Sequence, residues 1–140
     1  MQRLFRGCEF SPPTNAARIT AAERVLGAAL PSDLRYLLLE SNGLVGRHGI
    51  SLVWPVERIE TDNLAFRSNP DFRELYMPFD SLLFVGDDGG GDQFGFRILA
   101  GEVQPDNVYR WVHENDSRQW FAGELRDYLA RALGHDTESD

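Results

Sequence analysis

The stretch Ser81–Ile98, SLLFVGDDGGGDQFGFRI, decides how this chain is organised. It contains two short runs rich in apolar, β-branched and aromatic residues, Ser81–Val85 and Gln93–Ile98, which are typical of strands. The segment between them, Gly86–Asp92, consists of glycine and aspartate, which form tight turns or adopt positive φ at little cost. Two strands joined by such a segment predict a β-hairpin.

Two other runs have the composition of strands. Ile50–Trp54 follows a glycine-rich loop over Leu44–Gly49 and is stopped by Pro55, which has no N–H to offer a sheet. Val108–Val112 combines valine with aromatic residues between segments rich in turn-forming residues. The hairpin and Val108–Val112 predict that a sheet dominates the second half of the chain, and Ile50–Trp54 is a further strand in the first half.

The first half shows helical periodicity instead. A helix is predicted from an N-cap at Thr14 to Gly27, because apolar residues recur along it at the spacing of one helix face. A competing start is the capping-box pattern Thr20–Glu23, which would leave a helix of barely two turns. We prefer the longer helix.

Three more segments have helical character. A second helix is predicted to begin at Ser32 and to close at Asn42-Gly43, residues that tolerate a left-handed C-terminal cap. Val56–Asn69 has a weaker helical pattern. A last helix is predicted over Gln119–Leu133, with Gly134 as its cap.

The domain organisation follows from the length and from the absence of repeats. A chain of 140 residues is within the usual size of one domain with one core. We expect an N-terminal extension over residues 1–13, a single domain over residues 14–134 and an acidic tail over residues 135–140.

The charged residues and the single cysteine exclude several classes of function. All 14 basic residues are arginines, so a Schiff base, a P-loop lysine and a lysine general base are excluded. The 22 acidic residues give a formal net charge of −8, which would repel a phosphate backbone, and we expect no nucleic-acid partner. Cys8 stands alone, which excludes an internal disulfide and a multi-cysteine zinc site.

The sequence also indicates the cellular compartment of the protein. Residues 1–10 lack the apolar region of a signal peptide, and no apolar run approaches the length that crosses a bilayer. A lone cysteine fits a reducing compartment. We expect a cytoplasmic protein with no membrane partner.

The glycine- and aspartate-rich segment Gly86–Asp92 has three interpretations. A phosphate cradle is disfavoured because a strand follows in place of a helix N-terminus and because carboxylates would meet the anion. A calcium site is disfavoured because the EF-hand spacing is not met. A structural turn or a partner-facing loop is the interpretation we favour.

The polar stretch His113–Asp116 could supply an acid–base pair or metal ligands. The other histidines are His48, in the glycine-rich loop, and His135, in the tail, which argues against a three-histidine site. We favour a polar turn in which Asp116 or Ser117 helps to cap the last helix.

The three tryptophans of the chain can also be interpreted in two ways. Trp54, Trp111 and Trp120 could in principle form a ligand cage with nearby phenylalanines. Residues of this type are more often part of the core, and we favour that interpretation.

Three stretches together resemble the SUKH superfamily in its Smi/Knr branch, which includes the yeast cell-wall assembly regulator and many bacterial proteins. One contains Leu26-Gly27, Leu30-Pro31 and Asn42-Gly43, similar to the opening helix pair of the family; the others are Phe84–Phe96 and Val108–Glu114. One departure is Val112, where an acidic residue would be expected. The resemblance implies an α+β fold, with an N-terminal helix pair and a C-terminal helix packed on a mostly antiparallel sheet.

The resemblance also implies a function. It implies a non-enzymatic protein without a catalytic centre, cofactor or metal, and most bacterial relatives are implied to be immunity proteins against intracellular toxins, many of them nucleases. An acidic protein of this kind would bind a basic toxin domain, because opposite charges accelerate association. We expect five acidic residues to contact the toxin: Asp87, Asp88, Asp92, Glu114 and Asp116.

Two alternatives remain open. A regulatory or scaffolding role, as implied for the yeast relative, would keep the fold and change the partner. A metal-assisted enzyme would use the aspartate-rich loop together with His113.

Overall fold

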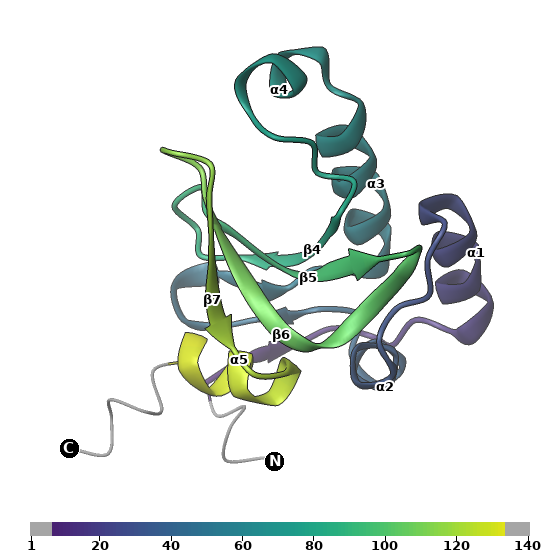
Figure 1. The fold of residues 1–140 in the computed structure, drawn as a ribbon. Coiled ribbons are helices and arrows are strands. Elements are labelled where there is room, and N and C mark those ends of the chain that lie inside the picture. The colour runs from purple at the N-terminus through teal and green to yellow at the C-terminus, as the bar shows by residue number, and fades with distance from the viewer. Residues whose placement is uncertain (1–6, 134–140) are drawn as a thin grey trace.

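Two antiparallel sheets and five α-helices form residues 7–133, the part of the chain that this computed structural model describes (Figure 1). The α+β class expected from the sequence is therefore confirmed, as are the helix pair near the N-terminus and the antiparallel pairing of the strands. The expected Gly134 cap and the tail over residues 135–140 lie outside the described residues.

The larger sheet contains the predicted hairpin. Its strands, in the order β4-β5-β6-β7, are β4 (Leu82–Asp87), β5 (Gln93–Leu99), β6 (Glu102–Val112) and β7 (Ser117–Ala122). In the hairpin, Leu83 pairs with Phe96, Phe84 with Gly95 and Asp87 with Gln93. The predicted hairpin is therefore confirmed, but the reversal that joins β4 to β5 is residues 88–92; Gly86 and Asp87, which were predicted as part of it, lie in β4 and pair with β5.

The smaller sheet includes the first strand of the chain. Its order is β1 (Glu9–Phe10), β2 (Leu44–Val45) and β3 (Ser51–Val53), with the short 3-10 helix η1 (Arg47–Gly49) between the last two. β3 confirms the predicted strand over Ile50–Trp54. The amide of Trp54 donates to the carbonyl of Val85 at 2.7 Å, which ties this end of the small sheet to β4.

The first helix, α1 (Ala16–Leu26), has the longer form that the sequence favoured, but its N-cap prediction was wrong by one residue. Asn15 is the cap: its side chain accepts a hydrogen bond from the amide of Arg18 at 2.8 Å. Thr14 instead donates its amide to the carbonyl of Leu38, at 3.1 Å, in the next helix. Gly27 ends α1 with φ of 75°, as expected of a glycine cap.

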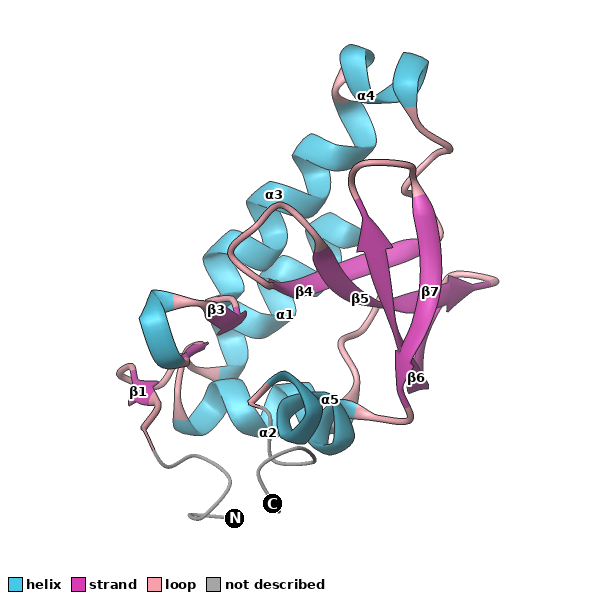
Figure 2. Ribbon diagram, turned by 90° about the vertical axis from the view of Figure 1, so that its left-hand side faces the viewer, coloured by secondary structure: helices cyan, strands magenta, loops and turns pink. Residues whose placement is uncertain are grey.

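The next helices match their predicted segments. They are α2 (Ser32–Glu40) and α3 (Val56–Ser68), and a short helix that was not predicted, α4 (Pro70–Leu75), follows. Buried Asn63 ties α3 to the sheet, because its side chain donates to the carbonyl of Phe84 and accepts from the amide of the same residue, both at 2.8 Å. Figure 2 shows α3 running alongside β4.

The predicted last helix over Gln119–Leu133 is wrong in its first third. β7 occupies that part, and the helix α5 (Leu125–Ala132) begins only after Gly123. Cross-strand pairing with β6 prevails over the helical spacing of the apolar residues. Asp116 and Ser117 therefore cap no helix; the side chain of Glu124 accepts the amide of Asp127 at 2.9 Å and caps α5.

The core lies between the sheets and the helices. Trp54 and Trp111 are buried in it, which confirms their predicted role, but Trp120 is exposed on β7. Gly86 lets β4 lie close to Leu52 of β3 and to Tyr128 of α5. A Cβ at this position would collide with the carbonyl oxygen of Leu52. The hydroxyl of Tyr128 donates to that same carbonyl at 2.7 Å.

Candidate partner-binding surface

Asp87, at the end of β4, holds the start of the glycine-rich reversal. Its Oδ2 accepts from Trp54 Nε1 at 2.8 Å and from Arg58 Nη2 at 3.0 Å, while its Oδ1 accepts the amide of Gly89 at 2.8 Å. The Arg58 guanidinium also lies over the Trp54 ring, 4.2 Å from the centroid. Both oxygens of Asp87 are therefore used to fix the loop to α3 and to the end of β3.

Asp88 and Asp92 share one arginine. The side chain of Arg110, on β6, reaches Asp88 Oδ2 at 3.2 Å and Asp92 Oδ2 at 2.7 Å. Asp88 Oδ1 also accepts the amide of Gly90 at 2.8 Å. The side chain of Asp88 is 31% exposed and that of Asp92 only 8%, so Asp88 is the one of the two that a partner can reach.

Asp92 is also bound to His113, which follows β6. Its Oδ1 lies 2.6 Å from His113 Nδ1 and accepts the amide of the same residue at 3.1 Å. Desolvation raises the pKa of Asp92, but hydrogen bonds from His113 and Arg110 outweigh it and leave the pKa below its ordinary value. The charged carboxylate is therefore the form that this site stabilises.

Asp116 organises the turn between β6 and β7. It has φ of 59°; its Oδ1 accepts from Trp111 Nε1 at 2.7 Å and from Arg118 Nη2 at 3.2 Å, and its Oδ2 accepts the amide of Met77 at 2.9 Å. Desolvation opposes ionisation, but these donors lower the pKa of Asp116 below its ordinary value. Asp116 thus binds the turn to the segment that follows α4.

Glu114 differs from the other four candidates. It is exposed, and within residues 7–133 its side chain makes no hydrogen bond or ion pair. The structure therefore brings the five candidates into two linked segments, residues 87–92 and the turn 113–116, which meet at the contact between Asp92 and His113. In this arrangement Glu114 faces solvent, Asp88 is half-buried and shares Arg110 with Asp92, and Asp87, Asp92 and Asp116 are used internally.

The chemistry of this arrangement is that of a fixed set of carboxylates, and Arg58, Arg110 and Arg118 neutralise part of their charge. Most carboxylate oxygens of the reversal already accept N–H groups, which leaves little capacity to coordinate a cation. Among the described residues, no group of three or more His, Cys, Asp or Glu side chains is placed to hold a metal ion.

Other exposed residues near these segments were not selected from the sequence. Leu75, the last residue of α4, and Met77, which follows the helix, are apolar and exposed. No sequence signal marked them, because their exposure depends on how distant segments pack.

Comparison with known protein families gives a match over most of the chain. The family model described as SMI1-KNR4 cell-wall matches residues 16–129, from the first residue of α1 into α5. A search of the curated proteins found no match. Within the described part of the chain, no helix is long and apolar enough to cross a membrane.

Proposed function

The chain belongs to the SMI1-KNR4 cell-wall family of the SUKH superfamily, and we propose that it is a non-enzymatic immunity protein that binds and neutralises an intracellular toxin. Membership in this family supports a toxin-immunity or cell-wall regulator-like domain with a protein partner. The net charge of −8 supports the further proposal that the toxin domain is basic, as a nuclease would be.

One observation carries this proposal: an acidic surface that is fixed before any partner arrives. Internal hydrogen bonds of Asp87, Asp92 and Asp116 hold the two segments that carry Asp88 and Glu114. A preorganised surface loses little conformational entropy on binding, and its charge accelerates association with a basic partner. We assign direct contacts with the toxin to Asp88 and Glu114 and positioning roles to the other three.

Coexpression tests the proposal. The protein encoded by the neighbouring gene would be expressed with and without this chain in a sensitive host, and growth would be scored. We expect wild-type protein to restore growth and the double variant Asp88→Arg/Glu114→Arg to lose protection. A double variant with the same change in charge, Glu40→Arg/Glu102→Arg, lies on α2 and at the start of β6 and should still protect. Thermal unfolding would check that each variant is folded.

Two results would contradict this proposal. Full protection by the Asp88→Arg/Glu114→Arg variant would mean that the toxin does not bind this surface. Failure of the wild-type chain to bind or inhibit the neighbouring protein would contradict the immunity role itself.

The cell-wall description of the matching family favours one second candidate, a regulatory or scaffolding domain. The two candidates differ in the partners they require. Affinity purification from the native cell should give one stoichiometric toxin for an immunity protein and several housekeeping proteins for a scaffold.

A further inference from the structure

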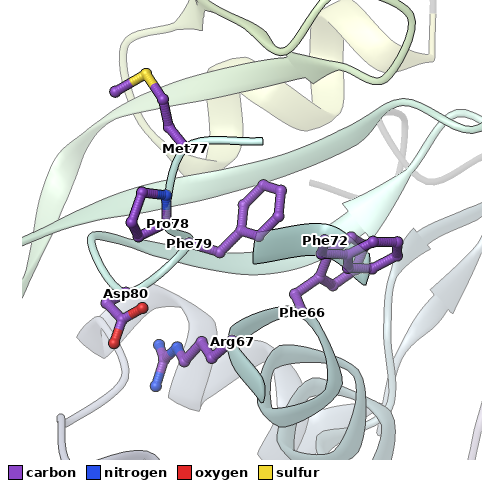
Figure 3. A pocket seen from close by; sticks show the side chains of 7 residues that line it. All are labelled: Phe66, Arg67, Phe72, Met77, Pro78, Phe79 and Asp80. Carbon is purple, nitrogen blue, oxygen red and sulfur yellow. The ribbon is translucent and has the colours of Figure 1, made fainter. Parts of the chain in front are cut away.

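A pocket of about 360 Å³ lies between α3, α4 and the segment that leads from α4 into β4. We call it the α4 pocket; it is lined by Phe66, Arg67, Phe72, Met77, Pro78, Phe79 and Asp80 (Figure 3). Its volume is within the range of pockets that enclose small ligands, and its lining is mostly apolar. It is therefore large enough to take a side chain of another protein.

The rim of the α4 pocket is apolar and exposed. Met77 is 63% exposed, and Pro78, which also lines the pocket, is exposed. Single exposed apolar residues are common on protein surfaces, but here two of them line a hollow together with aromatic rings. Methionine also adapts its shape to an incoming group. These properties are those of a binding site for an apolar anchor.

The rim is held in place by the turn between β6 and β7. Asp116 accepts the amide of Met77 at 2.9 Å, and Arg118 Nη2 donates to the carbonyl of Met77 at 2.8 Å. Arg118 Nη1 donates to the carbonyl of Pro78 at 3.1 Å. The pocket mouth is thus fixed by Arg118 and by the same turn that carries Glu114.

One anion and one cation line the pocket, Asp80 and Arg67; burial lowers the pKa of Arg67, and the negative charge of nearby Asp80 opposes this shift. Figure 3 shows the side chains of Asp80 and Arg67 on the same side of the pocket. The Arg67 guanidinium donates to the carbonyls of Leu26 and Leu82, at 3.2 and 3.3 Å, which directs it to the protein backbone. Asp80 is exposed. An incoming lysine or arginine would therefore meet the carboxylate of Asp80 beside the pocket.

We propose that the α4 pocket receives a large apolar side chain of the partner protein, with a lysine or arginine next to it pairing with Asp80. This inference rests on the immunity role proposed above and names the surface by which the toxin is held. Apolar anchors in desolvated pockets carry much of the energy of protein interfaces. The pocket would supply affinity, and the carboxylates would orient the partner protein and raise the rate of association.

Titration with a catalytically inactive form of the neighbouring gene product tests this surface. We expect Met77→Asp and Asp80→Arg each to weaken binding by at least about tenfold. Matched controls are Tyr36→Asp, at a residue that is 72% exposed, and Glu40→Arg, both on α2, and these should stay within about twofold of wild type. Wild-type affinity in both pocket variants would overturn the proposal and leave the immunity role intact.

A second measurement does not depend on the toxin. The chain has two methionines, Met1 and Met77, so a spectrum of the protein with ¹³C-methyl methionine contains one signal from the pocket, which Met77→Leu identifies. The peptide acetyl-Lys-Phe-Lys-amide should shift this signal, acetyl-Glu-Phe-Glu-amide should not, and Asp80→Arg should reduce the shift. An unmoved signal would overturn the proposed pocket. If the neighbouring protein binds no form of the chain, the immunity role fails and this spectrum alone decides the pocket.

Discussion

The carboxylate of Asp92 lies 2.6 Å from Nδ1 of His113, and this contact joins the reversal between β4 and β5 to the turn between β6 and β7. Arg110 strengthens the junction, because its guanidinium binds the other oxygen of Asp92. Two segments that are more than 20 residues apart in sequence are thereby held as one surface. The stability and the binding properties of the protein should both depend on this junction.

Removing the carboxylate should therefore destabilise the fold. We expect Asp92→Ala to lower the free energy of unfolding by about 2 kcal/mol, less than for a fully buried pair because the side chains of Arg110 and His113 are partly exposed. Urea unfolding followed by fluorescence measures this change. Glu114→Ala is the control, and it should stay within about 0.5 kcal/mol of wild type because its side chain is exposed. Equal midpoints for the two variants would show that the junction does not stabilise the fold.

The lowered pKa values of Asp92 and Asp116 predict a loss of stability in acid. A carboxyl whose pKa is lower in the folded state stabilises the protein fully above its ordinary value, here 3.8, and this contribution is lost as the pH falls through the lower folded value. Wild-type protein should therefore lose stability steeply below about pH 4. Asp116→Asn lacks one of these carboxylates, so its deficit relative to wild type should shrink in acid. Thermal unfolding from neutral pH downward measures the difference, and a constant deficit would contradict the prediction.

Gly86, in β4, and Gly90, in the reversal, differ in their importance for stability. Gly86→Ala should destabilise the protein by about 3 kcal/mol, because its Cβ would collide with the carbonyl oxygen of Leu52 and lie 2.7 Å from the hydroxyl of Tyr128. Gly90→Ala is a matched control: its Cβ would lie 3.5 Å from Asp88 Oδ1, an ordinary contact. We expect the control to unfold at nearly the wild-type urea concentration. Similar midpoints for the two variants would mean that the close approach of β4 to Tyr128 is not needed.

Divalent cations should not bind the aspartate-rich reversal. The carboxylates of Asp87 and Asp92 already accept two or more N–H groups each, and Arg110 supplies a positive charge where a cation would lie. Calorimetric titration with calcium, magnesium, manganese and zinc should give no heat of binding, and the melting temperature should not change. Saturable heat with any of the four would instead favour the metal-assisted alternative.

Helices and strands were predicted correctly where the local sequence signals and the tertiary packing favour the same structure. The hairpin around Gly86–Asp92 was predicted because its residues favour both the strands and the reversal, and α3 was predicted from spacing alone. The last helix was predicted too early, because Phe121 has helical spacing to Leu125 although it belongs to β7. Gly123 was the signal of the boundary between strand and helix.

The candidate surface was only partly visible in the sequence. The aspartates could be selected from their density, but the groups that bind them, Arg58, Arg110 and His113, come from other elements of the fold. The density of acidic residues in the sequence therefore could not distinguish the buried Asp92 from the exposed Glu114. The α4 pocket was not predicted at all, since it forms where a helix of six residues meets the segment before β4.

Calorimetric titration of the purified chain with an inactive form of the neighbouring toxin, at low and at high salt, is the most direct measurement of the immunity role. A one-to-one complex is predicted, with an affinity that weakens as salt screens the opposite charges of the two proteins. If the purified chain forms no complex at either salt concentration, it is not a stoichiometric inhibitor of this toxin.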